Sequence, residues 1–413
     1  MKMRIFSILG FIVFILLSPA RAEQAPESGF EIATQAPFAI IMDFETESVL
    51  YAKSADEIMA PASMAKLMTV AVIFQKLKHG ELRLDDTFTV TERAWKLSVA
   101  GKNESSKMFV SIGSQIRVED LLRGIIIQSG NDACTVVAEH ISGSEEAFAD
   151  LMNAEAKRLG LKNSVFKNAN GLPHPDMHVT AHDLGTLAVH LIKEYPEYYH
   201  YFAEREFTWN GIKQGNRNLL LGTYAGADGL KTGHTADSGY GMVASALVDG
   251  RRLIVVVNGL KSDADRASET KRLLDLGFRE FRQYILFKQN EVVGLSAVWA
   301  GEAESVSLVV TSTVKMLMRR SQRDGLKVTL SYDSPIASPV TKGQVVGKLK
   351  ITVPGQSDTE VPVAAAEDVD AGGFMTQIKI GVNGLFSSQP EPQSLLQQIA
   401  PEQNPSNAVP VHE

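Results

Sequence analysis

The spacing of apolar positions predicts a main domain that mixes strands and helices. Apolar runs at residues 38–42 and 49–52 flank the polar residues 45–48, which is typical of a β-hairpin. Further strands are predicted over residues 229–232, 240–247 and 253–260. Helical patterns cover residues 64–77, 118–127, 132–141, 144–159, 180–192 and 267–276. Because most helices lie between early and late strands, we expect an α/β (α+β) fold with an antiparallel sheet and a helical lobe.

The helix predicted over residues 64–77 is expected to lie at the centre of this domain. It is apolar on nearly every side from Leu67 to Phe74, which is typical of a buried helix. Lys76 and Lys78 lie in its last turn and Gly80 follows, as is common at helix C-termini. A long side chain in its first turn therefore borders a desolvated interior.

A change of pattern near residue 290 predicts a second, smaller domain. Short runs of alternating apolar and polar residues, separated by Gly and Pro, occupy residues 306–310, 327–332 and 347–353. We therefore expect a main domain over residues 37–285 and a small all-β domain over residues 290–382. The tail at residues 387–413 is rich in Pro, Gln and Asn, which predicts disorder.

Composition and charge exclude several classes of protein. With 44% hydrophobic and 22% charged residues, the 413-residue chain is neither wholly disordered nor fibrous. Its formal net charge of −7 provides no overall attraction to nucleic acid, so no nucleic-acid partner is expected. The single cysteine, Cys134, lies in an apolar helical run and is expected to be buried packing rather than a nucleophile.

The first 22 residues have the pattern of a secretory signal peptide. Lys2 and Arg4 precede an apolar run of 13 residues, which is short for a membrane span. A small-x-small cleavage site ends at Ala22, and residues 23–36 then form a polar lead-in. We expect export, with an uncleaved N-terminal anchor as the alternative.

Three short motifs carry the candidate chemistry, and they occur in a fixed order. They are Ser63-Met64-Ala65-Lys66, Ser129-Gly130-Asn131 and Lys231-Thr232-Gly233. Ser-x-x-Lys is weak evidence alone, because it also begins at Ser164, Ser268 and Ser312. Only Ser63 opens a buried helix and is followed by the other two motifs. The ordered set closely resembles the Ser-x-x-Lys, Ser-Asp-Asn and Lys-Thr-Gly signature of penicillin-binding proteins and class A β-lactamases, with Gly130 at the middle position of the second motif.

The residue types suit nucleophilic catalysis by a serine. A serine hydroxyl needs a neighbour that takes its proton, and Lys66 shares a helix face with Ser63 because the two are three residues apart. A lysine acts as a base only when neutral, and burial and a second cation such as Lys231 lower its pKa. Ser129 can relay the proton toward the leaving amine. Asn131 offers an amide that holds the substrate backbone and orients Lys66.

The third motif is expected to bind the substrate's acidic end. Lys231 and Thr232 can bind a carboxylate, and Gly233 lets a substrate backbone approach closely on an edge strand. The backbone N–H groups of Ser63 and His234 are candidates for an oxyanion hole.

The segments around these motifs resemble the low-molecular-mass penicillin-binding proteins that are D-alanyl-D-alanine carboxypeptidases. The likeness extends over about residues 35–285 and more weakly over the β domain, and it includes residues 168–173 and Arg266. It implies a cofactor-free periplasmic enzyme that shortens the peptidoglycan stem peptide through an acyl-enzyme on Ser63, and that penicillin and other β-lactams acylate. Arg266 would then assist Lys231 and Thr232 at the terminal carboxylate. A surface arginine beside Asp263 and Asp265 is the alternative.

Two other functions are alternatives to this one. A class A β-lactamase usually adds a Glu-x-x-x-Asn loop, and the one segment with that spacing between the second and third motifs, Glu206–Asn210, alternates like a strand. A non-catalytic relative that only binds peptidoglycan would not need all the expected side chains. A metal site at His174, His178 and His182 is not expected, because Pro175 interrupts any helix through His174.

The C-terminal end departs from the family. Members often end in a basic amphipathic helix that binds the membrane, but residues 374–386 contain Lys379 as their one basic residue and several prolines follow. Membrane contact therefore has weak support, from the apolar pairs Leu385-Phe386 and Leu395-Leu396.

Overall fold

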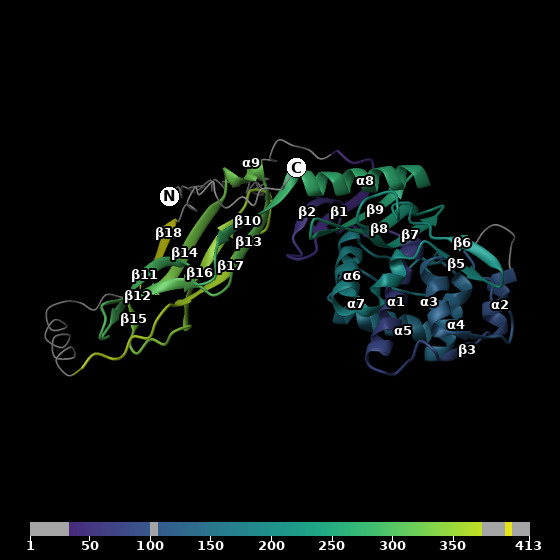
Figure 1. Ribbon diagram of the computed structural model, residues 1–413, viewed down its shortest axis with the longest axis horizontal. Helices are drawn as coiled ribbons and strands as arrows, with labels where there is room; N and C mark the ends of the chain where they lie inside the picture. Colours follow the sequence, from purple (N-terminus) through teal and green to yellow (C-terminus); the bar gives the residue numbers. More distant parts are fainter. Residues whose placement is uncertain (1–32, 100–105, 374–392, 399–413) are drawn as a thin grey trace, which may run out of the picture. The chain divides into compact units, whose positions relative to one another are not determined.

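The structure is a computed structural model that describes residues 33–99, 106–373 and 393–398 (Figure 1). The predicted signal peptide at residues 1–22 and most of the C-terminal tail lie outside the described residues. In the part that is described, no helix is both long enough and apolar enough to cross a membrane.

A five-stranded antiparallel sheet forms the middle of the main domain, in the order β2-β1-β9-β8-β7. Its strands are β1 (Phe38–Asp43), β2 (Val49–Lys53), β7 (Ala227–Thr235), β8 (Gly239–Val248) and β9 (Arg251–Leu260). The predicted hairpin and the three predicted late strands are therefore confirmed. Strand β7, which carries the third motif, lies at one end of this strand order.

Helices cover both faces of this sheet (Figure 1). Along β1, Ala39 and Ile41 pack in the same cluster as Leu273 and Leu274 of α8 (Asp263–Glu280). The alternate residue Ile40 packs with the helices of the opposite face. This period of two is the one that a buried antiparallel sheet requires, and it confirms the expected α/β (α+β) layers.

The helical lobe surrounds α1 (Lys66–Lys78), whose residues from Lys66 to Phe74 are all buried. The predicted helices are confirmed within a few residues at each end. The other elements of the lobe are η1 (Ala62–Ala65), α2 (Glu92–Val99), α3 (Val118–Ile126), α4 (Asn131–Ser142), α5 (Glu145–Arg158), α6 (Ala181–Glu194), α7 (Pro196–Tyr199) and η2 (His200–Ala203). Cys134 of α4 is buried and free, as expected.

Two short hairpins complete the main domain. One pairs β3 (Thr87–Thr89) with β4 (Gln115–Arg117), and the other pairs β5 (Glu206–Trp209) with β6 (Ile212–Gly215). The Glu-x-x-x-Asn segment is therefore strand β5 and its turn, as the alternation predicted. Glu206 forms an exposed ion pair with Lys213.

The second domain is built from strands around its own apolar cluster. Strands β10 (Phe281–Phe287) and β13 (Val314–Arg319) pair, and α9 (Arg320–Arg323) follows. A seven-stranded sheet has the order β15-β11-β12-β17-β16-β14-β18. Its strands are β11 (Val292–Trp299), β12 (Ser305–Val310), β14 (Lys327–Ser334), β15 (Ile336–Ala337), β16 (Val345–Thr352), β17 (Thr359–Ala365) and β18 (Gln393–Gln398).

Two boundaries of this domain differ from the expectation. Strand β10 begins at Phe281, inside the range 37–285 given to the main domain, because its partner is β13 of the second domain. Strand β18 falls within residues 387–413, where we expected no structure, and it pairs with β14. An open strand edge binds another strand through backbone groups, so composition alone does not reveal such a pairing.

Candidate active site

Ser63 lies on a tight turn at the start of the central helix. The 3-10 turn η1 precedes α1, and Ala62 just before the serine has a φ of 46°. The backbone of Gly171 approaches this turn so closely that an added Cβ would lie 1.9 Å from the Ala62 carbonyl oxygen. The loop around Gly171 therefore holds the position of the serine.

Lys66 is the most enclosed charged group at the site. Its side chain is fully buried, and its Nζ lies 2.8 Å from Ser63 Oγ, 2.8 Å from Asn131 Oδ1 and 2.5 Å from the Asn170 carbonyl oxygen. The spacing of three residues on one helix explains the contact with Ser63. Asn131 and Asn170 come from the start of α4 and from the loop before α6.

Burial lowers the pKa of Lys66 to about 8, because the charged ammonium loses its hydration. The neighbouring Cys134 and Asp132 oppose this shift, and the positive charge of Arg217 adds to it. A lysine with this pKa is partly neutral near physiological pH and can accept a proton.

The second motif enters the site at the N-terminus of α4. Ser129 has a φ of 56° and is 1% exposed, and its Oγ has no hydrogen-bond partner among the described residues. An unpaired hydroxyl in the interior is unfavourable unless a ligand completes it. The geometry therefore leaves Ser129 Oγ available to a substrate or a transferred proton.

The third motif lies within strand β7, which packs against η1. Lys231 and Thr232 are 3% and 5% exposed, and burial together with the charges of Lys66, Arg217 and Arg266 holds the pKa of Lys231 well below its usual value. A Cβ on Gly233 would lie 2.9 Å from the Pro61 carbonyl oxygen, so only glycine fits. His234 is exposed and stacks on Tyr240 with ring centroids 3.9 Å apart.

Arg266 of α8 is buried at 4% exposure and is not the surface arginine of the alternative interpretation. It still pairs with Asp263, and its guanidinium carbon lies 5.7 Å from the Tyr240 ring centroid. Its Nε has no partner among the described residues. The charge of Arg266 is one of those that lower the pKa of Lys231. Arg266 therefore belongs to the cationic end of the site.

Sequence reasoning missed Arg217, which lies at the same cationic end of the site. We call Lys231, Arg266 and Arg217 the cationic cluster. Arg217 is exposed, bonds to Ser106 Oγ and accepts a contact from Arg266 through its carbonyl oxygen at 3.4 Å. Its charge lowers the pKa of both Lys66 and Lys231. It lies in a polar connection before β7 with no motif spacing, so the sequence contained no signal for it.

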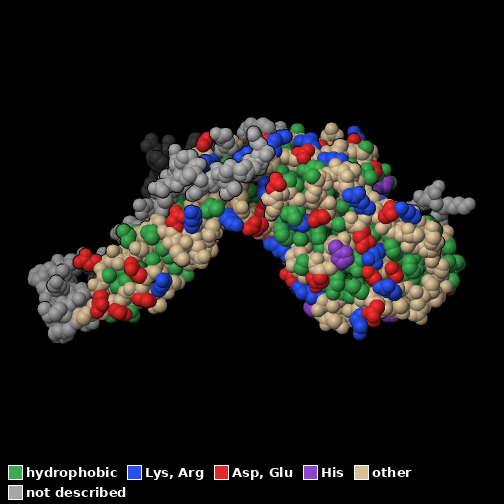
Figure 2. Space-filling model, viewed as in Figure 1, with side chains coloured by type: hydrophobic (Ala, Val, Ile, Leu, Met, Phe, Trp, Pro, Cys, Tyr) green, Lys and Arg blue, Asp and Glu red, His purple; other side chains and the backbone are tan. Residues whose placement is uncertain are grey.

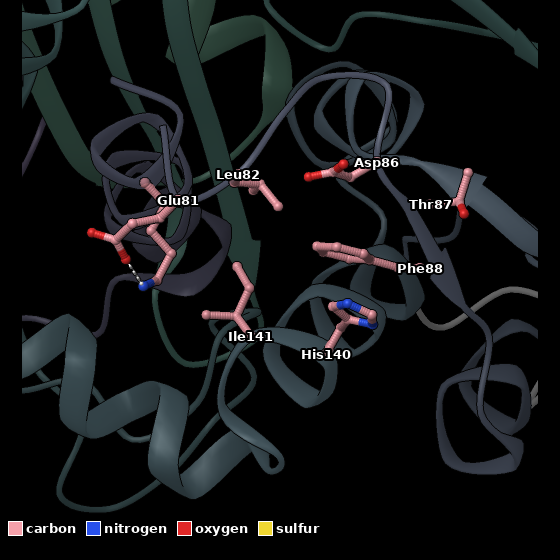
Figure 3. Close-up of a pocket in the computed structure, with 8 residues that line it drawn as sticks. Glu81, Leu82, Asp86, Thr87, Phe88, His140 and Ile141 are labelled. Atoms are coloured by element: carbon pink, nitrogen blue, oxygen red, sulfur yellow. Dashed lines mark hydrogen bonds and ion pairs between the residues drawn. The ribbon is translucent and has the colours of Figure 1, made fainter. Parts of the chain in front are cut away.

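A separate pocket of about 430 Å³ lies at the other end of α1 (Figure 3). Figure 3 shows the ring of Phe88 against that of His140. Their centroids are 3.7 Å apart, and Lys76 forms an ion pair with Glu81 at 2.8 Å. The lining described by the structure contains none of the predicted site residues; it is Lys76, Glu81, Leu82, Asp86, Thr87, Phe88, His140 and Ile141. Ten residues of α1, about 15 Å, separate Lys76 from Lys66.

No metal centre is evident at either place. Among the described residues there is no group of three or more His, Cys, Asp or Glu side chains placed to hold a metal ion. His182 instead approaches Asp56, with Nδ1 2.9 Å from Oδ1.

Comparisons with known proteins agree with this geometry. The family model described as D-alanyl-D-alanine carboxypeptidase matches residues 21–262, and the model for the C-terminal domain of penicillin-binding protein 5 matches residues 281–371. D-alanyl-D-alanine carboxypeptidase DacC of Escherichia coli K12 is 40% identical over 82% of this chain and 85% of its own.

Solved structures give the same result. Penicillin-binding protein 5 from Haemophilus influenzae has a TM-score of 0.72 and 34% identity, covering 83% of this chain and all of its own. Penicillin-binding protein D2 from Listeria monocytogenes in its ampicillin-bound form has a TM-score of 0.54 and 28% identity, covering 60% and 99%. With a serine, a buried lysine and a cationic cluster in one site, the chain belongs to the D-alanyl-D-alanine carboxypeptidase family of serine-type peptidases.

Proposed function

We propose that the enzyme removes the terminal D-alanine of peptidoglycan stem peptides through an ester on Ser63. The observation that carries this proposal is the 2.8 Å contact between Nζ of the fully buried Lys66 and Oγ of the partly exposed Ser63. In this mechanism Lys66 is the general base, Ser63 is the nucleophile and the start of α1 supplies a positive dipole end.

Lys66 acts in its neutral form, which has two N–H bonds and one lone pair. The two N–H bonds can donate to Asn131 Oδ1 and to the Asn170 carbonyl oxygen. The lone pair is then left to face the hydroxyl of Ser63. The two acceptors thus aim the base at the proton that it must take.

Substrate binding is assigned to the cationic end of the site. The terminal carboxylate of a D-Ala-D-Ala peptide would bind Lys231, Thr232 and Arg266, with the exposed Arg217 at the entrance. Cations that are buried and hold few hydrogen bonds gain most from such an anion. Gly233 has no side chain, and this would let the substrate backbone lie along β7.

Each step of the reaction is assigned to a group in the site. Ser63 Oγ attacks the penultimate carbonyl, and its proton passes to Lys66. The backbone N–H groups of Ser63 and His234 would hold the oxyanion. Ser129 relays a proton to the amine as the peptide bond breaks and D-alanine leaves. Water then attacks the ester carbonyl and gives a proton to Lys66. Lys66 passes that proton to Ser63 Oγ as the ester bond breaks, and the shortened peptide leaves. Asn131 holds the substrate backbone throughout.

Penicillins are proposed to acylate the same serine. The Listeria relative was solved with ampicillin bound, and this chain shares its fold over 60% of the residues. A β-lactam offers a strained amide in place of the peptide bond and a carboxylate in place of the terminal one. We also propose a periplasmic location, reached through the signal peptide at residues 1–22. Membrane contact through the C-terminal region stays a prediction.

The assignment is tested by labelling with a fluorescent penicillin, followed by intact-mass analysis. Ser63→Ala should abolish covalent labelling. Ser312→Ala is the matched control, because Ser312 begins another Ser-x-x-Lys and is exposed in the second domain. Labelled Ser63→Ala protein would overturn the proposal. Release of free D-alanine from a stem-peptide mimic distinguishes the carboxypeptidase from a β-lactamase, which would turn over penicillin rapidly without releasing D-alanine.

A further inference from the structure

The position of the Asn170 carbonyl on Lys66 depends on the side chain of the same residue. Asn170 is 2% exposed, and its Oδ1 accepts from the backbone N–H of Leu172 at 2.9 Å. Its Nδ2 donates to Glu145 Oε1 at 3.1 Å. The amide is therefore held at both ends, once by its own loop and once by a carboxylate from another element.

Glu145 is the first residue of α5, but it is not the cap of that helix. Ser144 fills that role by accepting from the Ala147 N–H. Glu145 Oε1 accepts from Thr135 Oγ1 at 3.0 Å as well as from Asn170, and Arg93 donates to Oε2 at 2.9 Å. The carboxylate is 12% exposed. Its two neutral partners thus hold one oxygen in a fixed place beside the active site.

We propose that Glu145 is a positioning residue for the general base. It fixes the amide of Asn170, and through it the carbonyl oxygen that receives one N–H of neutral Lys66. With that acceptor in place, the lone pair of Lys66 points at Ser63. This inference rests on the proposed role of Lys66 as the base.

The contact works through hydrogen bonds rather than through charge. Burial is the main cause of the lowered pKa of Lys66, and the neighbouring groups that add to it or oppose it are Cys134, Arg217 and Asp132. If Glu145 acted purely through its charge, its removal would have the opposite effect on activity, because a nearby carboxylate favours the ammonium form of Lys66. Removing such a charge would increase the neutral fraction of Lys66 and raise activity near pH 7, whereas loss of positioning lowers activity at every pH.

The ion pair with Arg93 offers a second explanation that can be tested separately. Arg93 is half exposed and also lies within 4 Å of Glu139 and Glu146. Exposed pairs of this kind contribute little to stability. Arg93→Gln should therefore leave catalysis unchanged if Glu145 acts through Asn170.

The experiment measures the second-order rate of Ser63 acylation by a fluorescent penicillin, with kcat and KM for D-alanine release and the melting temperature as companions. Glu145→Ala should slow acylation about tenfold to a hundredfold, since misplacement of about 1 Å has effects of that size. KM should change little, because the carboxylate-binding residues are untouched. Glu145→Gln keeps an acceptor oxygen for Asn170 and should restore most of the rate.

A double-mutant cycle distinguishes loss of the Glu145–Asn170 hydrogen bond from a general loosening of the fold. Asn170→Ala should slow acylation as Glu145→Ala does, and the double variant should be no slower than either one. Asn170→Ala also tests the contact if Glu145→Ala does not fold. Four outcomes would each overturn the inference. They are additive losses in the double variant, an unchanged rate in Glu145→Ala, a rate increase in Glu145→Ala at pH 7, and an equal loss in Arg93→Gln. If the wild-type protein is not acylated on Ser63, the proposed function itself fails.

Discussion

Gly171 offers a direct test of how closely the nucleophile turn is held. Its φ is 80°, and a Cβ there would lie 1.9 Å from the oxygen and 2.6 Å from the carbon of the Ala62 carbonyl. An ordinary contact of 3.4 Å would require about 1.5 Å more room. The loop is anchored on α1, because Thr69 Oγ1 donates to the Ala169 carbonyl oxygen at 2.6 Å and Lys66 Nζ contacts the Asn170 carbonyl oxygen, so the loop is not free to move away. We expect Gly171→Ala to displace the turn that carries Ser63.

The expected effect on catalysis exceeds the effect on stability. A left-handed alanine costs roughly 1–2 kcal/mol of folding free energy. Displacing Ser63 from Lys66 by about 1 Å should slow acylation about a hundredfold, which corresponds to about 2.7 kcal/mol in the barrier. The assay is the rate of acylation by a fluorescent penicillin, measured on folded protein well below its melting temperature.

Gly160→Ala is the matched control for this variant. Gly160 has a φ of 72°, and no heavy atom lies within 4 Å of its added Cβ in the described structure. The control therefore contains the backbone strain without the crowding. If Gly171→Ala acylates within about twofold of Gly160→Ala, the reasoning is refuted, because crowding at Ala62 would then have no consequence for Ser63.

Three further outcomes are expected. Acylation should rise with pH, since a Lys66 pKa of about 8 leaves about a tenth of the residue neutral at pH 7 and about nine-tenths at pH 9; a flat profile contradicts this. Asp132→Asn should lower the unfolding free energy by about 2–4 kcal/mol in denaturant titrations, because the buried carboxylate accepts from the backbone N–H groups of Met108 and Phe109. Arg266→Ala should raise KM about ten- to a hundredfold for a peptide with a free terminal carboxylate but not for its amide.

The local parts of the site could be predicted because short spacing determines them. Ser63 and Lys66 meet since residues three apart share a helix face, and this holds although the serine lies on a 3-10 turn rather than in the α-helix. The buried helix was visible in its apolar residues. Ser129 and Lys231 were identified through the order of the motifs, and not from any property of the chain that brings α4 and β7 to α1.

The parts that were missed depend on tertiary structure or on the backbone. The acceptor on Lys66 from Asn170 is a carbonyl group, which every residue has, so no sequence pattern marks it. Glu145 is 25 residues from Asn170, and a search for a Glu-x-x-x-Asn spacing led instead to the exposed hairpin at Glu206. Arg217 joins the cationic cluster because the fold brings the connection between β6 and β7 next to Arg266 of α8.

If the proposed roles hold, the cationic cluster of Arg217, Lys231 and Arg266 should link substrate binding to the strength of the base. In the free enzyme, the charge of Arg217 helps to hold the pKa of Lys66 near 8 and so keeps part of it neutral. A bound carboxylate would cancel that charge, which raises the pKa of Lys66 and makes it a stronger base when Ser63 must lose its proton. The rising limb of kcat, which reports the complex, should therefore lie at higher pH than that of kcat/KM, which reports the free enzyme. Arg217→Ala should move the kcat/KM limb upward in pH and reduce the difference. If the two limbs coincide in the wild-type enzyme, the carboxylate does not act on Lys66, and the cluster serves binding alone.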